Sequence, residues 1–445
     1  MAITDALARD IASGHLPAET RLPTHRELAD EMKVAVGTVT RAYAEAEKRG
    51  LIYSLGRAGT FVGSARSGGL RLVNAYEQLS DLIDLTRYRL AVSEDPDLLT
   101  TFRKLSRRSA NQSLLQYTPP GGLRHHRKAG AAWIARLGRE VAPHSVVLTA
   151  GAQNALNIVL SMIARRGDWV VAESHTYPSL PALAELHGLN LIAVDCDDEG
   201  PLPDAFEAIC RQKKPRSLFT NPTLNNPTSI TVSEARRRQI ASIAARHEVL
   251  IIEDAVNHAL PSDPPPLFCS IAPEITFLIA SLSKVLAAGL RVCYMVGPSH
   301  TTARLQELVH TSVHIVSPIC LEIAAMWISD GTAERTLALR RNECRTRYEI
   351  AMEVLGERKL ITSCEAYSGW LELPPPWTAK EFVLEAFARG VKLSPAESFA
   401  VEKKKAGNAV RICLGGNTSR ESLRQGLLII RDILDKPSQL ESPRV

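Results

Sequence analysis

Residues 275–297 read ITFLIASLSKVLAAGLRVCYMVG, in which two apolar runs flank a short polar turn that contains a lysine. The runs 275–280 and 291–297 have the length and composition of buried strands. The turn between them, Ser281-Leu282-Ser283-Lys284, therefore begins where a strand ends. Because ligands of open α/β sheets bind beyond the carboxyl ends of the strands, functional side chains are expected at this turn.

Similar apolar runs recur earlier in the chain with helical stretches mostly between them, at 145–149, 169–173, 189–194, 216–220 and 249–254. This alternation indicates an α/β fold with a mainly parallel sheet and helices on both faces. Past Pro318 the sequence is helical to about residue 355, and then shorter elements follow: strands at 369–373 and 409–414 and helices at 378–389 and 420–435. We expect a large lobe over about 100–320 and a smaller α+β lobe over about 330–440.

The first 64 residues have a different pattern. Helical apolar spacing recurs three times, over about 3–11, 24–33 and 36–50. Thr24 and Glu27 give the second of these helices a capping box. Strands 51–55 and 60–62 then surround a Gly-Arg-Ala-Gly turn. Three helices and a hairpin are the order of a winged helix-turn-helix domain, and residues 65–84 read as a linker to a second domain over 85–445.

Composition excludes several classes of protein. A chain of 445 residues and 48.7 kDa is long enough for more than one folding unit. Its 45% hydrophobic and 23% charged residues are typical of soluble globular proteins and argue against a disordered chain, a collagen-like repeat or a coiled-coil rod. Because 53 lysines and arginines face 48 aspartates and glutamates, any nucleic-acid surface must be local.

The eight cysteines are scattered without a C-x-x-C pair, which predicts neither a zinc site nor a disulfide framework, and no metal is expected. The N-terminus lacks the basic region and long apolar run of a secretory signal. No stretch approaches the ~18 apolar residues of a membrane span. These features predict a cytoplasmic protein that does not bind a membrane.

Suggestive side chains follow five of the predicted strands. They are Gly151, Ala152 and Gln153 at a helix start, the aromatic Tyr177, the amide-rich loop 221–228, the carboxylate Asp254, and Ser281, Ser283 and Lys284 with Arg291 further on. Singly each signal is weak, since a lysine after a strand is usually just solvated. Together they suit one ligand that has a phosphate, a flat ring with a nitrogen and an oxygen, and an aldehyde.

Over roughly residues 85–440 the sequence resembles the fold-type-I aminotransferases, which bind pyridoxal 5′-phosphate (PLP). The resemblance implies that Lys284 is the Schiff-base lysine and that Asp254 pairs with the ring nitrogen. It also implies that Asn226 hydrogen-bonds the ring hydroxyl and that Tyr177 stacks on the ring. The residues implied to bind the phosphate are Gly151, Ala152, Gln153, Ser281, Ser283 and Arg291.

Two further residues match the family from more distant segments. Arg411, in Asn-Ala-Val-Arg-Ile, matches the arginine that grips an amino-acid carboxylate, a bidentate role that lysine performs poorly. Tyr117 resembles the tyrosine that reaches the phosphate of a neighbouring subunit. The sequence departs from the family at Asn257, where a tyrosine is expected, and at Ala150, where serine is frequent. The loss of that phenol argues against efficient transamination.

The N-terminal domain resembles the GntR-type winged helix through the motifs GHLP (14–17), RLPTHRELA (21–29), GTVTRAY (37–43) and GTFV (59–62). The helix from Val36 is expected to enter the major groove of double-stranded DNA. The residues expected to contact DNA are Thr38, Thr40 and Arg41 on that helix, Arg26, and Arg57 and Thr60 in the wing. Residues 1–66 hold nine basic and eight acidic side chains, so affinity must depend on a few placed arginines and on dimerisation.

A winged helix joined to an aminotransferase-like domain resembles the MocR subfamily of GntR regulators. The resemblance implies a homodimeric transcriptional regulator that carries PLP on Lys284 and senses an amino-acid-like effector through aldimine chemistry. Three alternatives remain open at this stage: a working aminotransferase with a DNA-binding domain, a regulator whose degenerate pocket holds no cofactor, and an N-terminal helical module that binds protein instead of DNA.

Overall fold

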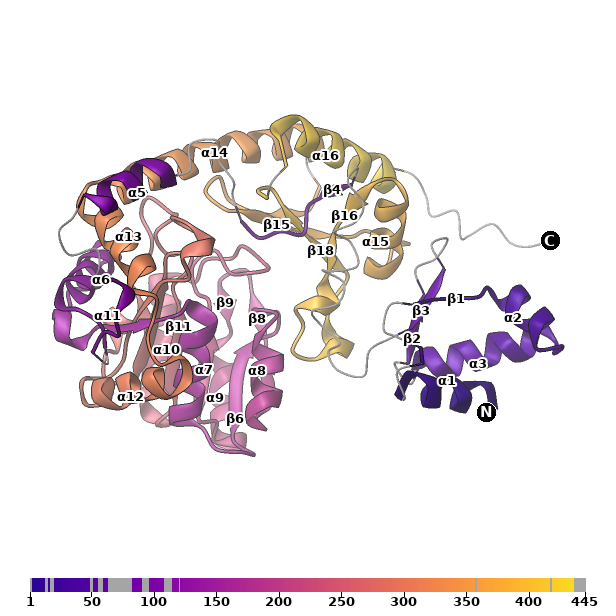
Figure 1. Ribbon diagram of the computed structural model, residues 1–445, viewed down its shortest axis with the longest axis horizontal. Coiled ribbons are helices and arrows are strands. Elements are labelled where there is room, and N and C mark those ends of the chain that lie inside the picture. The colour runs from indigo at the N-terminus through magenta and orange to yellow at the C-terminus, as the bar shows by residue number, and fades with distance from the viewer. Residues whose placement is uncertain are drawn as a thin grey trace. The chain divides into compact units, whose positions relative to one another are not determined.

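The computed structural model describes residues 2–12, 15–16, 20–48, 51–54, 59–62, 82–89, 96–107, 114–119, 121–356, 358–416 and 418–435 (Figure 1). The chain divides into two units, residues 1–81 and 82–445. Most of the predicted linker lies outside the described residues. Among the described residues, no helix combines the length and the apolar character that crossing a membrane requires.

The first unit contains the predicted helices and hairpin: α1 (Ala2–Ala12), α2 (His25–Glu31), α3 (Val36–Lys48), β2 (Ile52–Ser54) and β3 (Thr60–Val62). The Thr24 and Glu27 capping box of α2 is present. The sequence did not predict β1 (Arg21–Leu22), because two residues are too short to show a strand period; it pairs antiparallel with β3. A small core, which includes Leu22, Val39 and Val62, joins the helices to this three-stranded sheet.

The large lobe of the second unit is built on a seven-stranded sheet of order β5-β13-β12-β11-β10-β6-β7. The strands are β5 (Val147–Thr149), β6 (Trp169–Glu173), β7 (Asn190–Val194), β10 (Ser217–Thr220), β11 (Leu250–Asp254), β12 (Thr276–Ser281) and β13 (Cys293–Val296). Only β13 among them runs antiparallel to its neighbours. The mainly parallel sheet is therefore confirmed, and the carboxyl ends of β6, β10, β11 and β12 meet at one edge.

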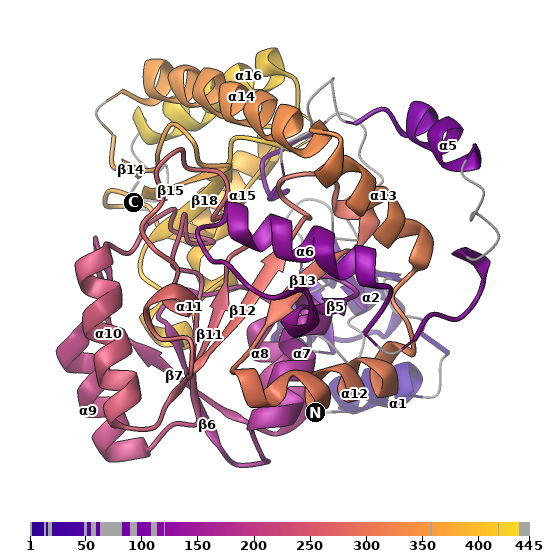
Figure 2. The same ribbon diagram turned by 90° about the vertical axis from the view of Figure 1, so that its left-hand side faces the viewer.

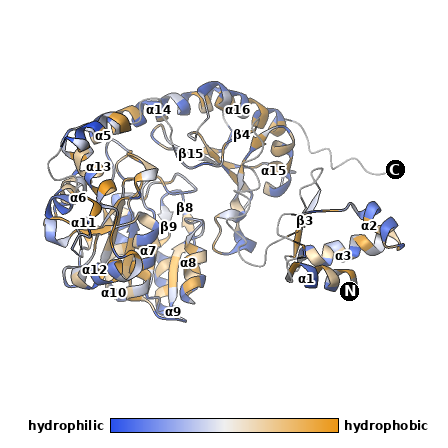
Figure 3. Ribbon diagram, in the orientation of Figure 1, coloured by the Kyte–Doolittle hydropathy of each residue, from blue (hydrophilic) through white to orange (hydrophobic). Residues whose placement is uncertain are grey.

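Helices pack on both faces of this sheet (Figure 2). One face packs against α9 (Pro203–Lys213) and α10 (Glu234–Arg246) through strand residues such as Val171, Leu218 and Ile251. Their chain neighbours Val170 and Ile252 face the other core, with α6 (Arg124–Arg136), α7 (Ala152–Ile163), α12 (Thr302–Val313) and α13 (Pro318–Ser329). Alternate side chains of a strand point to opposite faces, so strands that are covered on both faces are apolar over most of their length. In Figure 3 the helices that cover the sheet, such as α10 and α12, show both hydrophobic and hydrophilic residues.

The small lobe carries a four-stranded antiparallel sheet of order β14-β15-β18-β17. Its elements are α14 (Thr332–Leu355), β14 (Leu360–Ile361), β15 (Ser368–Glu372), α15 (Ala379–Ala388), β16 (Val391–Lys392), β17 (Ser394–Pro395), β18 (Ala409–Cys413) and α16 (Arg420–Asp435). The strand β4 (Ile83–Asp84) pairs parallel with β16. The last residues expected in the linker, 82–84, therefore belong to this unit, because their backbone is paired with the small lobe.

The remaining elements are short or lie at the edges of the lobes. The helices among them are α5 (Leu98–Ser106), α8 (Leu180–His187) and α11 (Phe268–Ile271), and the strands are β8 (Cys196–Asp197) and β9 (Gly200–Pro201). Single 3-10 turns are formed by Pro143–Ser145, Ala288–Leu290, Ser299–Thr301, Ala396–Ser398 and Lys403–Lys405. The two proline runs, 264–266 and 374–376, lie outside helices and strands, as predicted.

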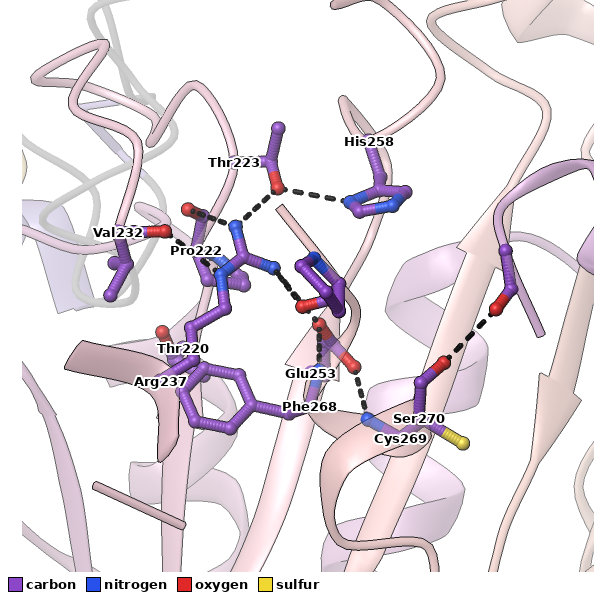
Figure 4. Close-up of polar contacts among 12 residues, drawn as sticks. Thr220, Pro222, Thr223, Val232, Arg237, Glu253, His258, Phe268, Cys269 and Ser270 are labelled. Atoms are coloured by element: carbon purple, nitrogen blue, oxygen red, sulfur yellow. Dashed lines mark hydrogen bonds and ion pairs between the residues drawn. The ribbon is translucent and has the colours of Figure 1, made fainter. Parts of the chain in front are cut away.

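One buried arginine holds the loop that follows β10 (Figure 4). Arg237, in the first turn of α10, is fully buried. It donates hydrogen bonds to the backbone oxygens of Pro222 (2.9 Å), Val232 (2.9 Å) and Pro266 (3.0 Å) and to the Thr223 hydroxyl (2.8 Å). Burial lowers the pKa of Arg237 to about 10, which still leaves it charged at neutral pH.

The charge of Arg237 is balanced by Glu253, whose Oε1 lies 3.8 Å from Nη1 and which is also fully buried. The carboxylate accepts hydrogen bonds from the backbone N–H groups of Phe268 and Cys269, with N···O distances of 2.9 Å, and so fixes the start of α11 (Figure 4). Glu253 directly precedes Asp254 at the end of β11. The Arg237–Glu253 pair therefore positions both the loop after β10 and the end of β11.

We predict that Arg237→Met lowers the free energy of unfolding by about 3–5 kcal/mol, because Glu253 becomes a buried charge without a cation. Urea denaturation followed by far-UV circular dichroism measures the change. The matched control is Arg238→Met on the same helix, whose pair with Glu234 is exposed; it should cost less than about 1 kcal/mol. Equal losses for the two variants would contradict the role assigned to Arg237.

Candidate functional site

Lys284 follows β12 and lies at the boundary of the two lobes. Its Nζ donates to the backbone oxygen of Tyr88 and lies 5.1 Å from the centre of the Tyr88 ring. The backbone oxygen of Lys284 accepts the hydroxyl of Tyr367 from the small lobe. Burial lowers the pKa of the amine to about 8, which raises the fraction of neutral, nucleophilic amine near neutral pH.

Asp254 ends β11, the strand beside β12, and is 7% exposed. Burial raises the pKa of its carboxyl group to about 7, an effect opposed by the backbone N–H of Val256 at 3.1 Å and by the charge of Lys284. Its backbone oxygen accepts a hydrogen bond of 2.6 Å from the side-chain amide of Asn221. A buried carboxylate of this kind gains stability from a cationic partner, such as a protonated ring nitrogen.

The loop after β10 presents Asn226 in a defined orientation. Its backbone N–H donates to the Asn221 side chain at 2.9 Å, and its side-chain oxygen accepts Nη1 of Arg411 at 2.6 Å. Because a guanidinium group only donates, the oxygen of the Asn226 amide must face Arg411. The NH₂ group is then left to donate elsewhere, which suits the contact with a ring oxygen that the sequence predicts.

Arg411, in β18, is 6% exposed, and its planar group lies 4.5 Å from the ring centre of Phe399. Besides Asn226, it donates to the backbone oxygen of Thr86 at 2.7 Å. Its Nε is buried and has no hydrogen-bond partner within the described part of the chain. An unpaired donor on a buried charge indicates a missing acceptor, and a carboxylate meets that requirement.

An anion-binding corner is formed where α7 begins. Gly151 precedes the helix with φ of 93°, and a Cβ built on it would lie 2.5 Å from Nη2 of Arg291. The first turn of α7, with Ala152 and Gln153, has no side-chain cap among the described residues, which leaves N–H groups for an anion. Ser281 and Ser283 hydrogen-bond each other through their hydroxyl groups at 3.1 Å. Glycine, arginine and a free helix start together fit a phosphate group.

The two tyrosines predicted at the cofactor differ in their surroundings. Tyr177 follows β6, is half-buried and packs on the main core. Burial raises the pKa of its hydroxyl group. The charge of Asp254 also raises this pKa, and the charge of Arg291 lowers it. Tyr117 is 80% exposed and packs its ring against His314 at 5.0 Å. The predicted reach of Tyr117 toward a neighbouring subunit stays a prediction.

Sequence reasoning missed Tyr88 and Tyr367, which both contact Lys284. Tyr88 also accepts a hydrogen bond at its hydroxyl from Nδ2 of Asn257 at 2.7 Å. Asn257 is the residue found where the family resemblance predicts a tyrosine, so at this position a phenol is supplied by a different segment. Tyr88 lies among polar residues directly after β4, where neither a strand period nor a motif marked it.

The residues predicted to contact DNA lie mostly on the surface of the first unit. Thr38, Thr40 and Arg41 on α3 and Arg26 on α2 are exposed, while Thr60 in β3 is half-buried. The hydroxyl of Thr40 donates to the backbone oxygen of Val36 at 3.1 Å, a bond within the helix. Arg57 lies outside the described residues. Arg21, which was not predicted, places its guanidinium group beside Gly59, where a Cβ would come within 2.9 Å of Nε.

Two family models match the chain. The model for bacterial regulatory proteins of the gntR family matches residues 1–62, and the model for aminotransferase class I and II matches residues 73–430. The chain belongs to the MocR subfamily of GntR-type transcriptional regulators. Its regulatory class and its aminotransferase-like fold are thereby settled, and PLP is the cofactor that this fold implies.

Relatives of similar architecture extend over nearly the whole chain. The HTH-type transcriptional regulator YdeF of Bacillus subtilis is 30% identical over 444 residues, which cover 98% of this chain and 94% of YdeF. The vitamin B6 salvage pathway transcriptional repressor PtsJ of Salmonella typhimurium is 28% identical over 412 residues, which cover 91% of this chain and 92% of PtsJ. Both alignments cover more than nine tenths of this chain and of the relative.

Solved structures resemble the aminotransferase-like part of this MocR regulator. Kynurenine aminotransferase of Pyrococcus horikoshii aligns with a TM-score of 0.76 at 20% identity, over 86% of this chain and 98% of that one. The α-aminoadipate aminotransferase LysN of Thermus thermophilus aligns with a TM-score of 0.73 at 22% identity, over 82% of this chain and 95% of LysN. The likeness establishes the fold-type-I architecture predicted from the sequence.

We predict that covalent capture of PLP by the cofactor-free protein accelerates as pH rises, with the midpoint of the increase near pH 8. The pKa of Lys284 is lowered to about 8, so below this pH the ammonium form predominates and cannot attack an aldehyde. Stopped-flow absorbance of the bound cofactor measures the rate. Lys284→Ala is the control and should show no adduct after borohydride reduction. A midpoint near 10 would show that the amine is not desolvated.

Proposed function

We propose that this regulator holds PLP on Lys284, binds an amino-acid-like effector at the same site, and alters its binding to double-stranded DNA in response. The observation that carries the proposal is the buried, unpaired Nε of Arg411 beside Asn226, at the boundary where Lys284 also lies. It supports an effector that carries a carboxylate as well as an amine. The identity of its side chain is not specified by these contacts.

The bound cofactor supplies an aldehyde carbon that exchanges one amine for another. Around it, Gly151, Ala152, Gln153, Ser281, Ser283 and Arg291 are proposed to hold the phosphate, with Tyr117 contributed by a second subunit. Asp254 would keep the ring nitrogen protonated, Asn226 would donate to the ring oxygen, and Tyr177 would cover the ring. Lys284 would serve as the covalent attachment point, and Arg411 would orient the effector by its carboxylate.

The residues that follow the linker provide a route from the effector site to the DNA-binding unit. The backbone oxygen of Thr86 accepts a hydrogen bond from Arg411, and the backbone oxygen of Tyr88 accepts one from Lys284. The backbone oxygen of Leu85 accepts the N–H of Cys413, and β4 directly before it pairs with β16. Holding the cofactor on Lys284 gives up the hydrogen bond from Nζ to Tyr88, and an effector amine that replaces Lys284 on the cofactor frees Nζ to make that bond again. The effector carboxylate competes with the backbone oxygen of Thr86 for Arg411. Both changes act on the segment to which the linker is attached.

Such competition can regulate only if the effector binds two arrangements of the protein with different affinity. The two lobes meet directly at this place, for example through the Ser229 hydroxyl, which donates to the backbone oxygen of Ser368 at 2.8 Å. A change in lobe closure is therefore the arrangement we propose to differ. A homodimer and a cytoplasmic location complete the proposal; exposed apolar residues of α5, such as Leu99 and Phe102, support a partner chain.

A working aminotransferase is the second candidate, and the lowered pKa of Lys284 together with the buried Asp254 favours it. The two candidates differ in turnover. Purified holoprotein mixed with an amino acid and a keto acid should show a lasting spectral shift without sustained keto-acid-dependent product if it is a sensor. Sustained product formation would establish the enzyme instead.

We predict that Arg411→Gln removes the preference for effectors with a carboxylate. Spectral titration of holoprotein with an α-amino acid and with the matched amine that lacks the carboxylate measures this preference. Losing a hydrogen bond between charged groups costs about 1.5–3 kcal/mol, or about 10–150-fold in affinity. The amine should bind wild type and variant alike, which is the internal control. An unchanged preference in the variant would assign the carboxylate to another residue.

We predict that Arg41→Ala weakens operator binding and lowers the slope of log affinity against log salt by about one unit, because one phosphate contact is lost. Cofactor content should stay unchanged. Arg211→Ala, which removes an exposed positive charge from α9 in the other unit, is the control. Electrophoretic mobility shifts at several salt concentrations supply the data; identical affinity of the Arg41 variant and the parent would refute α3 as the recognition helix.

A further inference from the structure

Two adjacent histidines and a glutamate converge in the large lobe, outside the proposed cofactor site. His125 and His126 lie in the first turn of α6, and Glu322 lies in α13, which packs on α6. Nε2 of His125 is 2.6 Å from Oε2 of Glu322, and Nε2 of His126 is 3.1 Å from the same oxygen. Figure 2 shows the two helices side by side.

This geometry matches the ligand set of a transition-metal ion. Zinc binds histidine nitrogen and carboxylate oxygen at about 2.0–2.2 Å, so neighbouring ligand atoms of a tetrahedral site are about 3.3 Å apart. All three ligand atoms lie within 4.8 Å of one another. The Nε2 of His126 is already near the required spacing, and a rotation of the half-exposed His125 ring would open the shorter gap.

Burial supports a preformed site that is open on one side. His126 is fully buried and the Glu322 side chain is 7% exposed, whereas His125 is 53% exposed. The carboxylate supplies an oxygen ligand with a negative charge and the two rings supply nitrogen ligands, a combination that favours a divalent transition-metal cation. The exposed side at His125 leaves room for entry of the ion and for a water ligand.

We propose that His125, His126 and Glu322 bind one divalent transition-metal ion of the zinc type and thereby fasten α6 to α13. Cysteine spacing predicted no metal, but it carries no information on histidines. Glu322 is 196 residues from His126 in the sequence, so no spacing motif could reveal the set. The site is independent of the proposed cofactor site, because none of its ligands belongs to that site.

Full-length holoprotein, stripped with a chelator, is titrated with Zn²⁺ in competition with a chromophoric chelator. We expect one ion per chain, and at least about tenfold weaker binding for His125→Ala, since even residues behind the ligands change metal affinity by about 10–100-fold. His125 is half-exposed, so its variant should fold. Glu322→Gln, which keeps the shape and removes the charge, should weaken binding similarly. His300→Ala, at another exposed histidine, is the control.

A second readout separates a specific site from loose surface binding. Zn²⁺ should raise the thermal midpoint of the wild-type protein and of His300→Ala by the same amount and that of His125→Ala by less, because an ion that binds only the folded form stabilises it according to its affinity. Absence of stoichiometric binding by the wild type would overturn the proposal. Equal binding and equal stabilisation in His125→Ala and wild type would overturn it as well.

Discussion

The arrangement of the cofactor site depends on a buried ion pair, Arg237 with Glu253. Ten residues of chain after β10 are almost entirely buried, which is unusual for a loop because each backbone polar group then needs a partner inside the protein. Arg237 supplies donors to three carbonyl oxygens and one hydroxyl of the surrounding chain. Glu253 balances the charge and fixes the start of α11. Asn226 and Asp254, the two residues proposed to meet the hydroxyl and the nitrogen of the cofactor ring, are thus positioned by one interaction.

A second constraint joins the site to the linker. Tyr88 touches Lys284 through its backbone oxygen and its ring, and it touches Asn257 through its hydroxyl. Arg411 lies 5.3 Å from the same ring. A single residue of the segment after β4 therefore contacts the amine, the guanidinium group and the amide that replaces the family's tyrosine. In an enzyme this segment would only shape the pocket; in a regulator it also carries the connection to the DNA-binding unit.

Much of the fold was predictable because its signals are local. The apolar runs at 169–173, 249–254 and 275–280 became β6, β11 and β12 with shifts of at most one residue at their ends. The capping box of Thr24 and Glu27 formed as its spacing predicted. The short strands β1 and β4 were missed, since two residues show no periodicity and form only where a partner strand is already in place. The positions of Asp254 and Ser281 at the ends of β11 and β12 were predictable for the same reason as the strands themselves, and their roles stay predictions.

The sequence by itself determined the two-domain organisation, the winged helix, the parallel sheet and the order of strand-end residues from Gly151 to Arg291, because strand and helix patterns depend on neighbours within a few positions. Only the tertiary structure decided that Tyr88 and Tyr367 contact Lys284, that Arg411 meets Asn226 across the lobes, and that His125, His126 and Glu322 converge. These contacts join residues that are 83 to 197 positions apart in the sequence. Their partners are selected by burial and packing between whole elements, which no local pattern records.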